Sequence, residues 1–331
     1  MRISSRMGYG SLSNHISRLQ ESVYFDTLRQ ATGKDIQSIA DYPSRLMDSK
    51  KIIATKNLKE NYIYHNEYAV SEMRLAEDAA RSISDDMQKI KDLSVTSLNL
   101  AYDGNVSSIA IYIRGIMEDM VRNANMDFNG KYLFSGSMTT PNSILNDYPD
   151  MNNMPYELVY GEPSPDNPSG LSVVYKGNME ARTINKDSHT NEAINMTGEQ
   201  LFGDGGVEFF QPIIDIYNTL LYAKDSYEFR ESLDYVDRED ALKIAEFQQV
   251  VSFNIEMMDR ETAMLASRKE RLETVNLQML EECVRLDEVK SLKEDVEITK
   301  LLTRLANEEV SLQYTLQAGG RMNRYSLFSY I

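Results

Sequence analysis

The sequence contains no tryptophan, one cysteine and three histidines among its 331 residues. A single cysteine, Cys283, excludes an intrachain disulfide framework, so packing has to hold the fold together. The histidines His15, His65 and His189 are far apart in sequence, and no histidine or cysteine lies at metal-ligand spacing from another. We therefore expect no metal, no cofactor and no catalytic residue, and we interpret the chain as a non-enzymatic protein.

Long apolar runs are also missing. The longest lies at about 109–113 and is far too short to cross a bilayer. The first twenty residues contain no apolar segment of the kind found in a cleaved secretory signal. We expect a protein without membrane insertion, and these features are compatible with export by a route that reads no hydrophobic signal.

Basic residues are scarce overall, because the formal net charge is -16 and the pI is about 4.7. This balance argues against a nucleic-acid-binding protein, which normally presents a basic face. The charge is unevenly distributed. Residues 1–60 hold 10 Lys and Arg against 6 Asp and Glu, whereas residues 129–206 hold 4 against 10. An acidic middle segment suggests a solvated module.

Glycine and proline are rare except in one segment. Six of the eight prolines lie between 141 and 168, and nine of the sixteen glycines lie between 130 and 206. Asn129-Gly130 predicts a tight turn, because both residues tolerate positive φ. The runs KYLFSG, YELVYGE and LSVVYKGN have the aromatic and branched content of strands. We expect a small β-rich module at 129–206.

The N-terminal part of the chain is predicted to be helical. Leu12, Ile16, Leu19 and Val23 form one apolar stripe in a helix over 2–31. Gly33 is expected to cap the end of this helix, and Pro43 to begin the next. That second helix should run to about residue 101 and be followed by a third at about 106–126.

The C-terminal part shows two apolar stripes in different phases. Helix is expected near 208, over 226–247, and from about 250 to 318. Alternating spacings of three and four residues link ten positions, seven of them apolar: 265, 268, 272, 275, 279, 282, 286, 289, 293 and 296. The second stripe is Ile298, Leu302, Leu305, Glu309, Leu312 and Leu316. The pattern favours a coiled coil interrupted by a break; the alternative is one long helix on a globular core.

Both ends of the chain resemble the flagellin superfamily. The N-terminus opens with Met-Arg-Ile and runs an amphipathic stretch into the turn at Thr32-Gly33-Lys34. The C-terminal region carries an acidic stretch at Glu294, Asp295 and Glu297, the run LQYTLQAGGRM and the ending SLFSYI. The resemblance covers about 90 residues on the N-terminal side and about 70 on the C-terminal side.

Within that superfamily, the hook-associated protein 3 branch is the most similar. RNANMDFNGKYLFSGSMTTPN resembles an element of that branch, and YKGNMEARTINKDSHTNEAINMTGEQLFG resembles part of its inserted domain. Asn178 stands where the branch usually has Asp. A second departure is IADYPSRLM, in which Asp41 and Pro43 keep only part of the usual turn.

The resemblance implies a mainly α fold with a β-rich insert. Residues 1–42 and 286–331 would form an inner coiled-coil domain, 43–128 and 207–285 a helical rod domain, and 129–206 a small outer β domain. The terminal stripes are too extensive to be buried within a two-helix pair, so neighbouring subunits would cover them. The expected subunit-packing residues are Leu12, Ile16, Leu19, Val23, Ile298, Leu302, Leu305, Leu312 and Leu316.

The resemblance also implies a structural adaptor between the flagellar hook and the filament. Such a protein is extracellular, leaves the cell through the flagellar type III export apparatus with an export chaperone, and assembles as a ring. Its partners would be copies of itself, hook-associated protein 1 and flagellin. One alternative is a filament-forming flagellin, which would be a dominant protein of sheared filaments. Another is a cytosolic coiled-coil scaffold, which the matching termini disfavour.

Overall fold

The computed structural model describes residues 2–36, 42–98, 106–140, 154–222, 228–230 and 236–328. The fold is mainly α-helical, with long terminal helices and a small central region that contains the strands. Two compact units form: residues 1–60 with 280–331, and residues 61–279. The three-domain division expected from the sequence follows other boundaries and stays a prediction.

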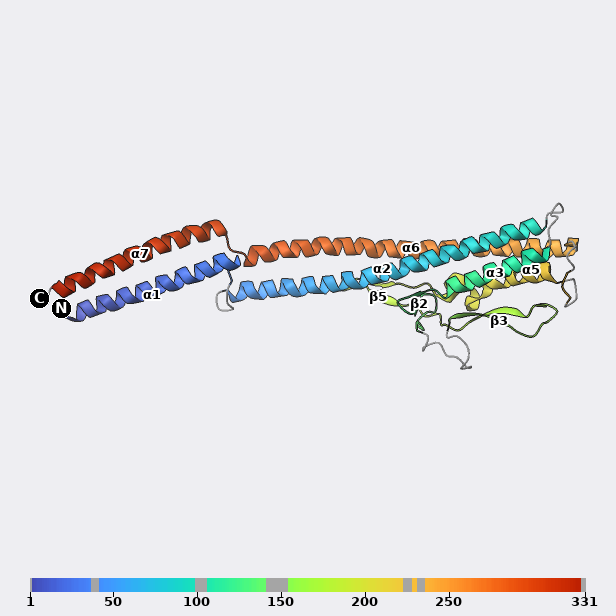
Figure 1. The fold of residues 1–331 in the computed structure, drawn as a ribbon, viewed down its shortest axis with the longest axis horizontal. Helices are drawn as coiled ribbons and strands as arrows, with labels where there is room; N and C mark the ends of the chain where they lie inside the picture. Colours follow the sequence, from blue (N-terminus) through green and yellow to red (C-terminus); the bar gives the residue numbers. More distant parts are fainter. Residues whose placement is uncertain are drawn as a thin grey trace. The chain divides into compact units, whose positions relative to one another are not determined.

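The first unit is built from both ends of the chain. Helix α1 (Arg2–Thr32) and helix α7 (Ile298–Phe328) run side by side (Figure 1). Gly33 ends α1 with a φ of 69°, and its amide donates to the Arg29 carbonyl oxygen at 2.8 Å, as the glycine cap predicts. Helix α2 (Pro43–Ser97) begins at the predicted proline.

A helix break lies where the sequence changes phase. Three residues separate the end of helix α6 (Arg238–Glu294) from the start of α7, which confirms the predicted interruption. The prediction of a helix over 226–247 is wrong at its start. Phe229 instead forms an isolated β-bridge with Tyr222, and the two rings stack with their centroids 5.2 Å apart. The side chain of Asp237 then caps α6 by accepting a hydrogen bond from the Asp240 amide at 2.8 Å.

The second unit has an apolar core formed by four helices. Helix α3 (Val106–Ala124) packs on α5 (Gln211–Leu221), and both contribute to one core with parts of α2 and α6 (Figure 1). Methionine is frequent in this core, because its unbranched side chain fills irregular gaps. The core includes Met73, Ile83, Met87, Ile113, Met117, Met120, Ile213, Ile216, Leu220, Ile244, Val251, Met258 and Leu265.

The predicted stripe along α6 is correct at Leu265, Leu272 and Met279 but is displaced by one residue at Val275. Leu265, Leu272 and Met279 are buried, as expected. Val275 is only half-buried, because the next residue, Asn276, faces α2 instead and is buried. The apolar pattern points to Val275 because the true seam position, Asn276, is polar and the nearest apolar residue lies one position away.

The strands of the described residues form three separate antiparallel pairs. Asn129 and Gly130, with φ values of 53° and 74°, turn the chain between β1 (Asp127–Phe128) and β2 (Lys131–Tyr132), which confirms the predicted turn. The other two pairs are β3 (Tyr156–Tyr160) with β4 (Leu171–Tyr175), and β5 (Thr183–Asn185) with β6 (Asn191–Ala193). Because isolated two-stranded pairs are marginally stable, they depend on the helices beneath them.

An aromatic cluster anchors this strand-containing region. The Tyr156 ring lies 4.8 Å from Tyr175 and 5.2 Å from Phe202, and Phe202 lies 4.6 Å from Phe210. Phe202 ends the short helix α4 (Gly198–Phe202), which Thr197 and Gln200 open with a capping box. A Cβ atom on Gly198 would lie 2.7 Å from the Tyr156 hydroxyl, so only glycine fits there.

Asn178 ties the KYLFSG segment to this cluster. Its side-chain oxygen accepts from the Ser137 amide at 2.8 Å, and its side-chain nitrogen donates to the Ser137 hydroxyl at 2.7 Å. The neighbouring Gly136 has a φ of 69°. A Cβ atom there would lie 2.1 Å from the Asn178 carbonyl oxygen. The turn therefore needs glycine for its backbone conformation and for space.

Gly136→Ala should destabilise the second unit more than Gly130→Ala. Both glycines have positive φ, so alanine costs about 1 kcal/mol at either position. Gly130 has open space around it, whereas Gly136 meets the Asn178 backbone, which should add about 2 kcal/mol. Urea unfolding followed by circular dichroism measures the difference. Equal losses in the two variants would show that this close approach does not matter.

Candidate subunit-packing surface

All nine residues predicted to pack subunits lie on α1 or α7, and none is fully buried. Ile298, Leu302 and Leu316 are the most exposed, at 47%, 43% and 49%. The other six are half-buried: Leu12, Ile16, Leu19, Val23, Leu305 and Leu312. The α1–α7 pair thus covers part of the predicted stripe and leaves the rest accessible.

The face of α7 that contacts α1 differs in part from the predicted stripe. Leu301, absent from the prediction, is only 2% exposed. It continues through Leu305 and Leu312 by the spacing of a helix face, a signal that the sequence already contained. Glu309 and Leu316, by contrast, are exposed, so the predicted stripe leaves the α1-facing side at these two positions.

The two helices approach closely at one point. A Cβ atom added to Gly319 would lie 3.0 Å from the Leu12 side chain, a tight contact for any larger residue. Glycine at this point on α7 therefore allows Leu12 to approach the helix backbone. The AGG run of the C-terminal motif thus has a packing role within the chain.

A buried carboxylate holds the same helix pair at its other end. Asp26 on α1 is 1% exposed and accepts hydrogen bonds from Arg304 on α7 and, at 2.8 Å, from Arg29. Burial raises the pKa of Asp26, but the hydrogen bonds from Arg304 and Arg29 outweigh this effect and lower the pKa below its ordinary value. One turn further along α7, Glu308 accepts a bond of 2.8 Å from Ser22.

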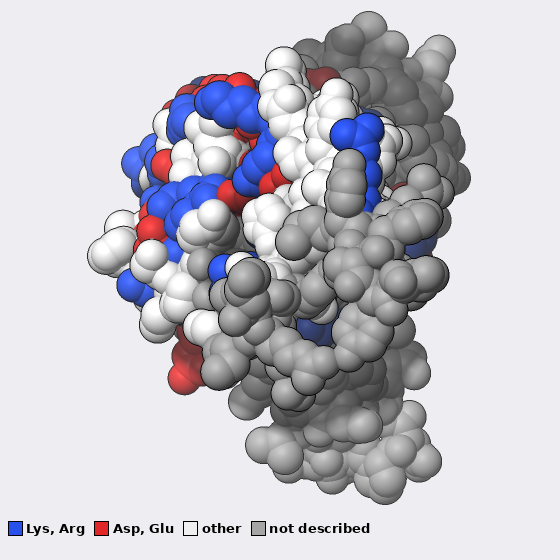
Figure 2. All heavy atoms as spheres, turned by 90° about the vertical axis from the view of Figure 1, so that its left-hand side faces the viewer, with Lys and Arg blue, Asp and Glu red and all other residues white. Residues whose placement is uncertain are grey.

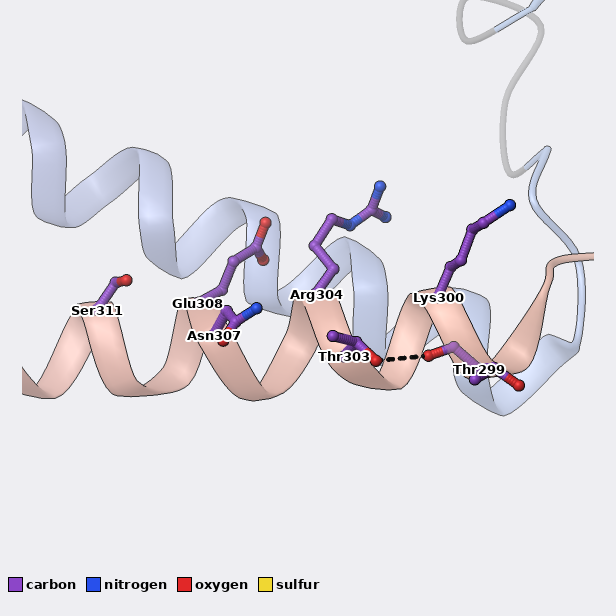
Figure 3. A pocket seen from close by; sticks show the side chains of 7 residues that line it. All are labelled: Thr299, Lys300, Thr303, Arg304, Asn307, Glu308 and Ser311. Atoms are coloured by element: carbon purple, nitrogen blue, oxygen red, sulfur yellow. Dashed lines mark hydrogen bonds between the residues drawn. The ribbon is translucent and has the colours of Figure 1, made fainter.

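A shallow polar groove of about 410 Å³ runs along α7. Its lining is Thr299, Lys300, Thr303, Arg304, Asn307, Glu308 and Ser311 (Figure 3). Because every lining residue belongs to one helix, and Arg304 and Glu308 already bond to α1, we interpret the groove as the polar flank of the helix pair.

A row of apolar side chains, four residues per step, winds around part of α7. Ile298, Leu302, Val310 and Tyr314 are exposed and follow one another at multiples of four residues, with Ala306 between them. In Figure 2, Lys and Arg side chains lie beside Asp and Glu side chains, with uncharged surface adjoining them. An exposed apolar row on a polar protein is typical of a surface that binds another protein.

Polar bonds connect the two short segments between helices, the one that follows α1 and the one that precedes α7. The Asp35 amide donates to the Glu294 carbonyl oxygen at 2.7 Å, and the Val296 amide donates to the Gly33 carbonyl oxygen at 3.0 Å. Lys34 pairs with Asp295, a hydrogen bond that raises the pKa of Lys34 and lowers that of Asp295. Residues of the acidic stretch therefore hold the two segments together.

The described residues contain no group of three or more His, Cys, Asp or Glu side chains arranged to hold a metal ion. Among the described helices, none combines the length and the apolar character that crossing a bilayer requires. The prominent feature of the first unit is therefore a helix pair with a polar flank and an exposed apolar row.

Comparison with known proteins agrees with this architecture. Residues 3–139 match the family described as the bacterial flagellin N-terminal helical region. A search of curated proteins finds no match to this sequence. The family match covers α1, α2, α3 and the turn at Asn129-Gly130.

Solved structures of flagellar hook-associated proteins have a similar fold. A Vibrio parahaemolyticus protein assigned as a flagellar hook-associated protein has a TM-score of 0.59 at 15% identity, covering 77% of this chain and 99% of that one. Hook-associated protein 3 from Legionella pneumophila has a TM-score of 0.51 at 13% identity, with 75% and 99% covered. The L. pneumophila flagellar junction protein FlgL has a TM-score of 0.50 at 12% identity, with 74% and 99% covered.

The α1–α7 pair should lose stability in acid. Because the pKa values of Asp26 and Asp295 are lowered in the folded chain, both carboxylates stabilise it above their ordinary pKa values near 4, and this contribution disappears as pH falls through the lowered values. Thermal unfolding at pH 7 and pH 3 should show the loss.

Asp26→Asn should lower stability at pH 7 by about 1–3 kcal/mol, since the half-exposed Arg304 loses its carboxylate partner and Arg29 keeps only Asp35. Its unfolding should also depend less on acid. The matched control is Asp48→Asn, which removes an exposed pair with Lys293 and should change little. Identical behaviour of the two variants would contradict a stabilising role for the buried carboxylate.

Proposed function

We propose that this protein is a structural adaptor that joins the flagellar hook region to the flagellin filament. The observation that carries the proposal is the exposed apolar row on α7, because a folded single chain leaves it uncovered. The flagellin N-terminal helical region and the fold of hook-associated protein 3 support a flagellar role. In this proposal the protein builds an axial structure and catalyses no reaction.

The row suggests how copies would assemble. The helix pair covers one face of α7 with α1, so a second face with Leu302, Val310 and Tyr314 is available to neighbours. Copies arranged in a ring would bury these rows against one another, and exclusion of water from apolar side chains would drive the assembly. Residues 1–42 and 286–331 would then form the inner domain, with 43–128 and 207–285 a helical domain and 129–206 the outer domain.

The role implies further partners. The ring would contact hook-associated protein 1 on one side and flagellin on the other. Before assembly the chain would pass through the flagellar type III export apparatus, accompanied by an export chaperone, and reach the extracellular hook-filament junction. A filament-forming flagellin remains the second candidate, because the matched N-terminal region is named for that family.

Localisation along intact flagella should distinguish the two candidates. A fluorescent label on the chain should give one focus per flagellum, between hook and filament, because an adaptor is needed only once along the axis. Labelled flagellin in the same cells serves as the control and should mark the whole filament. Signal along the full filament would identify the chain as a flagellin and overturn the adaptor role.

Leu302→Asp should prevent assembly without unfolding the chain. Leu302 is 43% exposed, so the monomer should tolerate aspartate at this site. In the ring the aspartate would be a buried, unpaired charge, which costs several kcal/mol per subunit. Cells carrying the variant should make hooks without filaments and release flagellin into the medium. Ser311→Asp is the matched control, because Ser311 is exposed, lines the polar groove and lies nine residues beyond Leu302, on the opposite side of α7. Leu312→Asp should also block assembly, but it should loosen the α1–α7 pair as well.

Circular dichroism and secretion assays would show whether the Leu302→Asp chain folds and is exported. Normal filaments built by a folded, exported variant would mean that the apolar row stays exposed in the assembly, and the proposed packing surface would be wrong.

A further inference from the structure

The apolar seam of α6 in the second unit repeats every seven residues. Ile244, Val251, Met258, Leu265, Leu272 and Met279 are all 5% exposed or less. Helix α2 supplies the facing residues, with Met73, Ala80 and Met87 buried at the same interval. Sliding one helix past the other by seven residues would place apolar residues against apolar residues again. This half of the seam therefore does not define which residues face each other.

The other half of the seam differs at each repeat. Its positions on α6 are Gln248, Ile255, Thr262, Lys269 and Asn276. Several polar bonds cross to α2 in this unit, besides the exposed Arg74–Glu273 pair. Gln248 donates to Ser94 at 2.9 Å, Ser84 donates to Asp259 at 2.8 Å, Lys269 pairs with Glu77, and Asn66 donates to Asn276 at 2.9 Å.

These bonds form only in the observed register. Sliding by seven residues in one direction would place Asn66 opposite Lys269 and Glu77 opposite Thr262. Sliding in the other direction would place Glu77 opposite Asn276. Each shift separates the Glu77 carboxylate from the Lys269 ammonium group, and both side chains are largely buried. Glu77 would keep its pair with Arg81 on the same helix, whereas Lys269 would lose this carboxylate partner. Burying a charge without its partner is strongly unfavourable, so the polar layers disfavour both shifts.

The β5–β6 hairpin contacts both helices at the same level. The two protons of the Asn66 amide reach the Asn276 side-chain oxygen and, at 3.0 Å, the Lys186 carbonyl oxygen beside β5. Glu192 on β6 pairs with Arg271 on α6 at 2.8 Å, and its pKa is lowered although burial acts in the opposite direction. The hairpin therefore bonds to α2 through Asn66 and to α6 through Arg271.

The position of Asn66 indicates specificity rather than stability. Its side chain is completely buried, yet its own side-chain oxygen has no hydrogen-bond partner among the described residues. Leaving a buried acceptor unpaired lowers stability, and a well-packed apolar pair would avoid this loss. Buried asparagine pairs fix the register of paired helices in other proteins at the same kind of cost.

We propose that the Asn66–Asn276 and Glu77–Lys269 layers, together with the β5–β6 hairpin, lock the register of α2 against α6. The apolar seam holds the helices together, and the polar layers with the hairpin select one of several alignments spaced by seven residues. The register of the helix pair and the placement of the hairpin thereby become one coupled choice.

Spin-label distance measurements on the full chain test the proposal. Labels at Arg74→Cys and Glu273→Cys, in a Cys283→Ser background, replace two exposed side chains that face each other across the pair. A shift of seven residues moves one label about 10 Å along the helix axis. The parent chain should give one distance. The variant with leucine at Asn66, Asn276, Glu77 and Lys269 should give a second population shifted by about that amount.

Two further variants make the outcome decisive. Leu272→Ala removes apolar volume from the same seam but keeps both polar layers, so it should lose stability and keep a single distance. Leucine at Asn66 and Asn276 alone should give a smaller shifted population. A single unshifted distance in the helical four-leucine variant would overturn the proposal and assign the register to the core formed with α3 and α5. A second distance in Leu272→Ala would overturn it too, because general loosening would then explain the shift.

Discussion

The first unit depends on the pairing of the chain's two ends. Asp26 and Arg304 are 278 positions apart in sequence, yet the Arg304 guanidinium group donates hydrogen bonds to the buried Asp26 carboxylate. Without that partner, Asp26 would be a buried charge with one remaining ion pair, from Arg29. The ends of the chain therefore have to meet before either terminal helix can bury its polar and apolar groups, which makes this unit strongly non-local.

The same pairing accounts for the surface that we assign to assembly. Each terminal helix carries more apolar surface than one partner helix can cover, because a two-helix pair buries one stripe on each member. α7 directs Leu301 to α1 and leaves Leu302 exposed, although the two residues are adjacent. One face of α7 packs on α1 within the chain, and another is available to neighbouring subunits. Such a helix suits a protein that first folds as a monomer and then assembles.

The second unit combines this helical pairing with a region whose strands are too short to stand alone. Tyr156, Tyr175 and Phe202 give that region a core, and Glu72 on α2 pairs with Arg182 beside β5. The strand-containing region is therefore attached to the helices by buried rings and by ion pairs. Its position on the helices and the alignment of the helices are linked through Asn66, which bonds to both.

The sequence by itself determined the features that local chemistry controls. Gly33 and Pro43 mark helix ends, Asn129-Gly130 adopts positive φ in a turn, and YELVYGE and LSVVYKGN contain the paired strands β3 and β4. Such signals depend on residues within a few positions of one another, so a pattern along the chain reveals them. The change of stripe near 296 likewise marks the break between α6 and α7.

Only the tertiary structure decided which face each long helix buries. Asn276, and not Val275, lies in the seam, where Asn66, 210 positions earlier in the sequence, donates a hydrogen bond to it. Glu308 turned toward α1, where Ser22 donates to it, and Phe229 paired with Tyr222 just after α5 instead of joining the helix. In each case, the deciding partner lies elsewhere in the chain, so a pattern of neighbouring residues along the sequence cannot reveal it.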